Sequence, residues 1–161
     1  MQLKLPFDST KPVAGEAIIE IDSALTNVFS YVGKRFFDNY PKWALEVVDF
    51  KPLDGNEVFV GAKAKQIRKD NDVAVESVFA ITEFQPENKL TLEGLNEPYK
   101  HSYFFEANEQ NQPTRLRFRF ELLELEIFMR PFEKLIRYAI EDGAENTVEN
   151  IKKLITTVEC S

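Results

Sequence analysis

One stretch near the C-terminal end of the chain has a strong helical pattern: residues 128–158 read FMRPFEKLIRYAIEDGAENTVENIKKLITTV. Apolar and small side chains recur there every three or four residues, which is the spacing of the buried stripe on an amphipathic helix. The predicted stripe comprises Phe132, Leu135, Ile136, Ala139, Ile140, Gly143, Thr147, Ile151, Leu154 and Val158. Pro131 fits the first turn, where a backbone N–H has no helical partner. At about 1.5 Å per residue such a helix is roughly 40 Å long or more, so it can cover a whole sheet.

The region before this helix has the pattern of consecutive short strands. The predicted strands are Ala14–Asp22, Leu45–Leu53, Val58–Arg68, Val73–Phe84, Lys89–Leu95, Tyr99–Ala107 and Thr114–Leu125. Short turns separate the last six, and connections this short join antiparallel neighbours. Two short helices are predicted after the first strand, one from Ala24 and one from Lys34 to Tyr40, and Pro41 is expected to end the second. We therefore predict an α+β fold in which a seven-stranded curved antiparallel sheet wraps around the long C-terminal helix.

Alternation along the predicted strands assigns one face of the sheet to the interior. On that face small side chains stand among large rings, as we expect where side chains leave room for a ligand. The candidate ligand-binding residues are Ala62, Ser77, Phe79, His101, Tyr103, Phe105, Phe118 and Phe120 from the sheet, with Leu135 and Tyr138 from the helix. The alternative is that the helix fills this space and leaves no cavity.

His101 is the only histidine of the chain and lies on the predicted inner face. Three interpretations stay open: a packed histidine that is bonded to the backbone, a residue that exchanges a hydrogen bond with a ligand, or a general acid or base. A single histidine excludes His-cluster metal sites, and no catalytic triad can be assembled around it. We therefore assign no catalytic residue, no metal site and no cofactor.

Composition narrows the classes of partner. Of the 161 residues, 27 are acidic and 20 are basic, so the net charge is −7. Such a surface repels phosphate backbones, and nucleic acid is not expected as a partner. No apolar run approaches the roughly 18 residues of a membrane span, so stable membrane insertion is not expected, and Met1–Pro12 lacks the pattern of a targeting signal. Because Cys160 is the only cysteine, we expect a cytoplasmic protein. We also expect residues 1–161 to form a single domain, and the protein to be a monomer or weak homodimer.

Several local motifs resemble those of one superfamily. They are IEIDSA at residues 19–24 before Val28 and Phe29, FDNYPKW at 37–43, VGA at 60–62, ITEFQPENKL at 81–90 and TRL at 114–116. In their order and spacing, from Ala14 to Val158, they resemble the START-like superfamily, also called SRPBCC or the polyketide cyclase/dehydrase and lipid transport family. The resemblance implies the helix-grip fold, in which a cavity between the sheet and the long helix takes a small hydrophobic molecule.

Three functions are compatible with this resemblance. The leading hypothesis is binding or transport of a small hydrophobic ligand, of lipid-, polyketide- or isoprenoid-like character, without catalysis. The second is an enzyme of the polyketide cyclase/aromatase type, in which His101 and Tyr103 orient the substrate. The third is a regulatory domain whose helix or sheet edge contacts another protein, and it predicts a filled interior and an exposed apolar patch.

Overall fold

The computed structural model describes residues 12–70, 72–107 and 113–160, so the predicted turn residue Asn71 and most of the predicted loop at 108–113 lie outside it. Seven antiparallel strands form one sheet in the order β1-β7-β6-β5-β4-β3-β2. The strands are β1 Val13–Ile21, β2 Val47–Pro52, β3 Lys63–Asp70, β4 Val73–Gln85, β5 Lys89–Gly94, β6 Tyr99–Ala107 and β7 Thr114–Leu122. The helical elements are α1 Leu25–Phe29, the π-helical turn η1 Ser30–Lys34, α2 Phe36–Trp43, the 3-10 turn η2 Ile127–Phe132 and α3 Glu133–Cys160.

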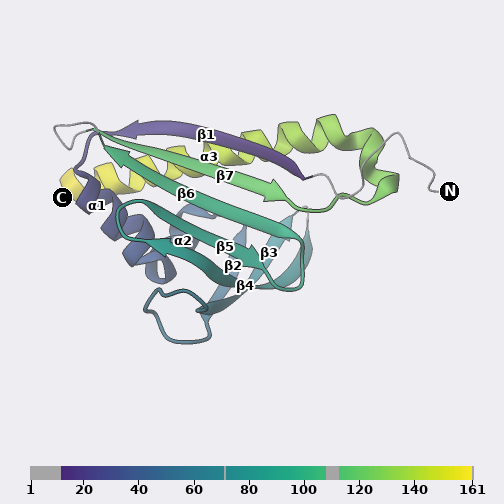
Figure 1. Ribbon diagram of the computed structural model, residues 1–161, viewed down its shortest axis with the longest axis horizontal. Coiled ribbons are helices and arrows are strands. Elements are labelled where there is room, and N and C mark those ends of the chain that lie inside the picture. The colour runs from purple at the N-terminus through teal and green to yellow at the C-terminus, as the bar shows by residue number, and fades with distance from the viewer. Residues whose placement is uncertain (1–11, 71, 108–112, 161) are drawn as a thin grey trace.

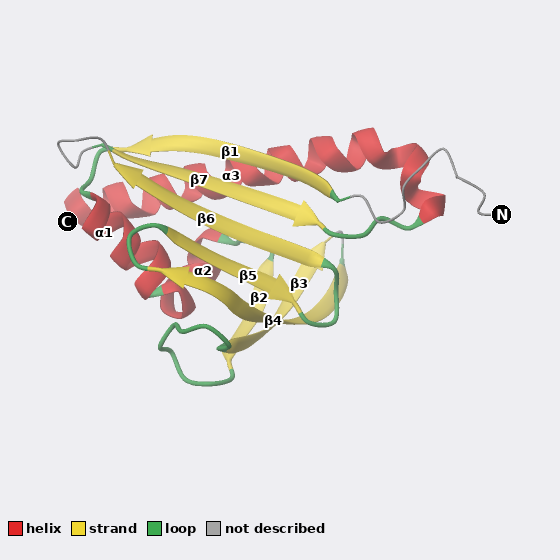
Figure 2. Ribbon diagram, in the orientation of Figure 1, coloured by secondary structure: helices red, strands yellow, loops and turns green. Residues whose placement is uncertain are grey.

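The sheet is strongly curved, and the helices lie on its concave side (Figures 1 and 2). α3 runs along β1 and β7, whereas α2 contacts β2 and α3, and α1 contacts β6. The predicted α+β fold, with a seven-stranded curved antiparallel sheet and a long C-terminal helix, is confirmed. Within the described part of the chain, no helix combines the length and the apolar character needed to cross a membrane.

Several predicted boundaries are wrong; β7, for example, ends at Leu122 instead of Leu125. Pro41 lies inside α2, which continues to Trp43 instead of ending at Tyr40. The proline removes one helical hydrogen bond, but the continued helix buries the Trp43 ring, which is 2% exposed. β3 begins at Lys63 and not at Val58, because Gly61 has a positive φ of 98° that turns the chain just before the strand. The C-terminal helix opens with the 3-10 turn, so its α-helical part begins at Glu133 instead of Phe128.

The buried stripe of α3 follows a different line from the predicted one. Buried or half-buried side chains occur at Ile136, Ile140, Ala144, Val148, Ile151 and Ile155. Of the predicted stripe, five residues are exposed (Phe132, Leu135, Ala139, Gly143 and Val158) and five are buried or half-buried (Ile136, Ile140, Thr147, Ile151 and Leu154). Neighbouring positions such as Gly143 and Ala144 satisfy a spacing of three or four residues equally well. Periodicity alone therefore could not determine the rotation of the helix about its axis.

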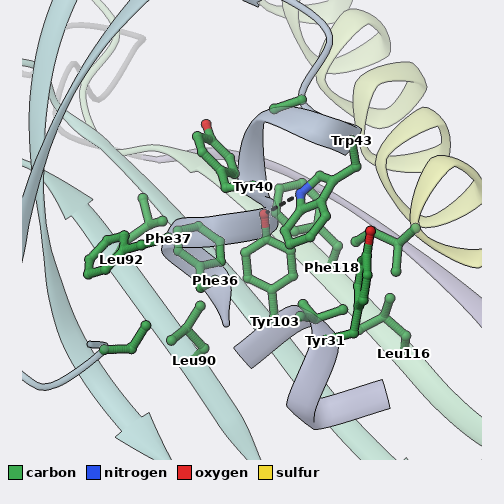
Figure 3. Packing of buried hydrophobic residues seen from close by; sticks show 14 of the residues in the cluster. Tyr31, Phe36, Phe37, Tyr40, Trp43, Leu90, Leu92, Tyr103, Leu116 and Phe118 are labelled. Carbon is green, nitrogen blue, oxygen red and sulfur yellow. Dashed lines mark hydrogen bonds between the residues drawn. The ribbon is translucent and has the colours of Figure 1, made fainter. Parts of the chain in front are cut away.

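The large rings of α2 form the centre of the hydrophobic core (Figure 3). The Phe36 side chain is fully buried. Its ring centroid lies 4.9 Å from that of Tyr40, 5.8 Å from Trp43, 6.3 Å from Phe79 and 5.7 Å from Tyr103. Rings at such separations attract one another in addition to burying apolar surface. α2 therefore fills the part of the concave side that lies over β4 and the middle of β6.

α3 approaches β1 closely at Gly15. A Cβ atom on Gly15 would lie 2.9 Å from Ile140 Cγ2 and 3.0 Å from the backbone nitrogen of Glu141. Valine at this position must push α3 away from the sheet, so we expect Gly15→Val to lower the free energy of unfolding by about 2 kcal/mol. Urea denaturation measures this change.

Gly143→Ala is the control for this substitution. A Cβ atom on Gly143 meets no described atom within 4 Å beyond the helix's own local backbone. Alanine in a helix is favoured over glycine by up to about 1 kcal/mol, so this variant should be as stable as the wild type or more stable. An unchanged urea midpoint for Gly15→Val would contradict the close packing of α3 on β1.

Candidate ligand-binding cavity

A cavity of about 620 Å³ lies between α3 and one end of β6 and β7, and it is partly open to solvent. The sheet contributes Arg68, His101, Phe118, Phe120 and Leu122 to its wall, and Trp43, Leu45 and Glu46 close one side. α3 covers it with Ile136, Ala139, Ile140, Gly143, Ala144, Asn146, Thr147 and Asn150. Most of this wall is apolar. The volume falls in the range of small-molecule sites, which is about 300–1,000 Å³.

The cavity forms where the packing of α2 ends. The rings of α2 reach Tyr103 on β6. The preceding inward-facing residue of β6 is His101, which pairs in register with Phe120 of β7. Its ring contacts are with the sheet residues Tyr99, Phe118 and Phe120. α3 covers this end of the sheet through Ile136 and Ile140, and the space beneath them is the cavity.

The structure separates the ten candidate residues into three groups. His101, Phe118 and Phe120 line the cavity. Buried core positions are occupied by Ala62, Ser77, Phe79, Tyr103 and Phe105. On α3, Leu135 and Tyr138 are 69% and 71% exposed. The seven core and exposed residues are therefore not in the cavity wall, which corrects the predicted location. For His101, Phe118 and Phe120, contact with a ligand stays a prediction.

Most of the small and polar inner residues accommodate side chains of the protein itself. The Oγ of Ser77 lies 2.7 Å from the Tyr99 hydroxyl, which accepts a hydrogen bond from Gln66 Nε2 at 3.3 Å. Tyr40 in turn donates to Gln66 Oε1 at 2.9 Å. Trp43 Nε1 donates to the Tyr103 hydroxyl at 3.3 Å (Figure 3). These bonds satisfy the polar atoms of a closed core, so Ser77 and Tyr103 are structural in this arrangement.

His101 lies in the cavity wall and is only 6% exposed. Neither ring nitrogen has a hydrogen-bond partner among the described residues, so the interpretation as a backbone-bonded histidine is wrong. Burial, together with the smaller effect of the positive charge of Arg68, lowers the pKa of His101 to about 3. The imidazole is therefore neutral near pH 7 and carries one N–H donor and one acceptor nitrogen.

Arg68 and Glu46 supply the charged groups of the cavity wall. Arg68 Nη2 lies 3.4 Å from Glu46 Oε1, and Arg68 Nε is buried with no hydrogen-bond partner in the described part of the chain. The sequence analysis missed both residues. Arg68 continues the inward-facing series Ala64 and Gln66, so the same alternation could have found it. Glu46 lies in the connection between α2 and β2, where no periodic pattern points to it.

Asn150 joins α3 to the end of α2 at the edge of the cavity. Its Nδ2 donates to the backbone oxygen of Trp43 at 3.1 Å. This bond holds the helix over the side of the cavity that Trp43 closes.

Across the described residues, no group of three or more His, Cys, Asp or Glu side chains is placed to hold a metal ion. The geometry therefore offers an apolar wall and a small hydrogen-bonding end.

Comparison with known proteins supports the fold. No family model and no curated protein sequence matches the chain. Among solved structures, the protein of unknown function SA2116 from Staphylococcus aureus superposes with a TM-score of 0.74 at 14% identity over 94% of this chain and 98% of that chain. The di-domain ARO/CYC StfQ from the steffimycin biosynthetic pathway gives a TM-score of 0.73 at 12% identity, and the match covers 94% of this chain and 53% of StfQ.

A plant protein has the same arrangement. The major latex-like protein 151 from Panax ginseng superposes with a TM-score of 0.61 at 12% identity over 88% of this chain and 97% of its own. Identities this low establish the architecture. The strand order, the covering helix and these structural neighbours together confirm the resemblance found in the sequence motifs. The chain therefore has the same fold as these proteins, a curved antiparallel sheet with a long C-terminal helix on its concave side.

Proposed function

We propose that the protein binds a small hydrophobic molecule in the cavity between α3 and the sheet. The observation that carries this proposal is the apolar wall, to which Phe118, Leu122 and Ile140 contribute, around a volume of about 620 Å³. An apolar ligand in this space removes the wall from water, and each Å² of apolar surface so buried contributes about 25 cal/mol. Lipid-, polyketide- or isoprenoid-like molecules have the size and the apolar character that such a wall accepts.

The two alternative functions receive less support. Tyr103 lies in the core with its hydroxyl bonded to Trp43, so it does not pair with His101 on a substrate in the cavity. The pKa of His101, about 3, is far from the near-neutral value that suits a general acid or base. A regulatory domain predicts a filled interior, which the cavity does not provide. We favour binding without catalysis, by a cytoplasmic monomer or weak homodimer.

A neutral fluorescent probe, N-phenyl-1-naphthylamine, tests this proposal. We expect saturable binding to the wild-type protein, seen as a rise in probe emission. Gly143 lines the cavity, and a side chain added there starts in open space. Gly143→Trp should therefore place its ring in the cavity and weaken probe binding about tenfold or more, which corresponds to about 1.4 kcal/mol.

Glu145→Trp is the matched control, because it adds the same ring to an exposed position of α3 outside the cavity wall. This variant should bind the probe as the wild type does. Equal affinities of the two tryptophan variants would show that the probe binds elsewhere. Absence of saturable binding to the wild type would contradict the proposal directly. Native mass spectrometry of the purified protein gives an independent readout, with a bound apolar compound as the expected result.

A further inference from the structure

One end of the cavity contains buried nitrogen atoms that the protein leaves without hydrogen bonds. Both ring nitrogens of His101 and the Nε of Arg68 have no partner among the described residues. Both side chains line the cavity. Buried polar atoms in folded proteins are nearly always paired, because an unpaired one has lost its bonds to water without replacement. A ligand group that pairs with one ring nitrogen and with Arg68 Nε would remove part of this penalty.

The pattern of donors and acceptors selects the chemistry of that group. A neutral imidazole offers one N–H donor and one acceptor nitrogen, whereas Arg68 Nε–H only donates. A hydroxyl group both donates and accepts, so it can pair with either kind of nitrogen. A carbonyl or ether oxygen only accepts, and it would leave the acceptor nitrogen of His101 unpaired.

The charges around the cavity argue against an anionic ligand. The guanidinium of Arg68 lies beside the carboxylate of Glu46, with 3.4 Å between Nη2 and Oε1. Its charge is therefore already balanced. A carboxylate placed next to Arg68 would also lie near Glu46, and these like charges would repel each other. A carboxylate also has no hydrogen to donate to His101.

We propose, on the basis of the binding function proposed above, that the ligand is an uncharged hydrophobic alcohol or phenol whose hydroxyl group bonds to His101 and Arg68. Its apolar body lies against Phe118 and Ile140, which line the cavity beside these polar groups. The Phe120 ring is half-buried and its centroid lies 4.8 Å from that of His101. A change of its side-chain rotamer gives the hydroxyl access to the imidazole.

Three bicyclic probes with the same ring system test this inference: 2-naphthol, 2-methylnaphthalene and 2-naphthoate. The methyl compound matches the volume of the naphthol but cannot form hydrogen bonds, and the naphthoate carries a negative charge. By isothermal titration calorimetry at pH 7 we expect 2-naphthol to bind about tenfold more tightly than 2-methylnaphthalene, which corresponds to roughly one well-paired buried hydroxyl. 2-Naphthoate should bind more weakly than 2-naphthol.

Two variants assign the preference to His101. His101→Phe keeps an aromatic ring and removes one of the two proposed partners of the hydroxyl group, so the advantage of 2-naphthol over 2-methylnaphthalene should become clearly smaller. His101→Asn keeps one donor group and one acceptor and should retain part of the preference. Thermal unfolding establishes that each variant is folded before it is titrated. An undiminished preference for 2-naphthol in His101→Phe would overturn the inference.

Nuclear magnetic resonance of the wild-type protein gives a test without substitutions. His101 is the only histidine, so its two ring ¹⁵N resonances are assigned without ambiguity. We expect 2-naphthol, and not 2-methylnaphthalene, to shift at least one of them by several parts per million. If 2-methylnaphthalene binds but 2-naphthol shows no advantage and no ¹⁵N shift, the hydroxyl inference fails while the binding function stands. If none of the three probes binds, both fail together.

Discussion

Replacing Phe36 with alanine is expected to lower the free energy of unfolding by about 4 kcal/mol, because truncation of a fully buried phenylalanine removes apolar burial and leaves a cavity. The Phe36 side chain is fully buried, and rings from α2, β4 and β6 surround it. Their positions depend on one another, so the site cannot collapse around the smaller residue without moving α2. Chemical denaturation with urea, followed by circular dichroism, measures the loss.

Phe128→Ala is the matched control for Phe36→Ala, because the same side chain is 68% exposed at that position. Its removal should change the free energy of unfolding by no more than about 0.5 kcal/mol. If both substitutions had the same effect, the aromatic cluster of α2 would not be the centre of the core. A large effect at Phe36 alone would confirm that the aromatic cluster of α2 is a main part of the core.

Acidification is expected to destabilise the wild-type protein by about 3 kcal/mol at pH 4.5 through His101 alone. The pKa of His101 is about 3 in the folded protein, against 6.5 without the effect of burial. Between these values the unfolded chain binds a proton that the folded protein does not. The contribution of His101 to the free energy of unfolding therefore rises with pH in this window. It is fully present above about pH 6.5 and is lost as the pH falls toward 3.

His101→Phe isolates this contribution from the carboxylates, which also titrate in acid. The variant has no imidazole to protonate, and the chain has no other histidine. The wild type should therefore lose more stability than the variant between pH 7.5 and pH 4.5, by about 3 kcal/mol. Urea denaturation of both proteins across this range is the measurement. Parallel curves would mean that solvent reaches the imidazole freely and that His101 is not buried in the native state.

Part of the candidate site could be predicted from alternation along the strands. His101, Phe118 and Phe120 are two-residue neighbours of core positions on β6 and β7, and the structure places all three in the cavity wall. The same rule applied to β3 reaches Arg68, which follows Gln66 by two residues. Glu46 lies in a connection with no periodic pattern, so only the folded structure could place it beside Arg68.

The small residues of the inner face show why the extent of the cavity could not be predicted. Ala62 and Ser77 indicated space for a ligand, but Ala62 is packed within the hydrophobic core and the Tyr99 hydroxyl lies against Ser77. A small side chain in a strand is equally consistent with a ligand and with a ring from elsewhere in the protein. Which of the two fills the space depends on the position of α2, and the continuation of this helix past Pro41 was itself not predicted.

The sequence by itself determined the seven strands, the antiparallel pairing of the six that short turns connect, and the long C-terminal helix, because residue periods and turn lengths are local properties of the chain. Tertiary structure decided which part of the concave side remains open. That outcome depends on the packing of α2 against Phe79 and Tyr103 and on the rotation of α3 over Gly15. These contacts join residues far apart in the chain, and no local pattern encodes them.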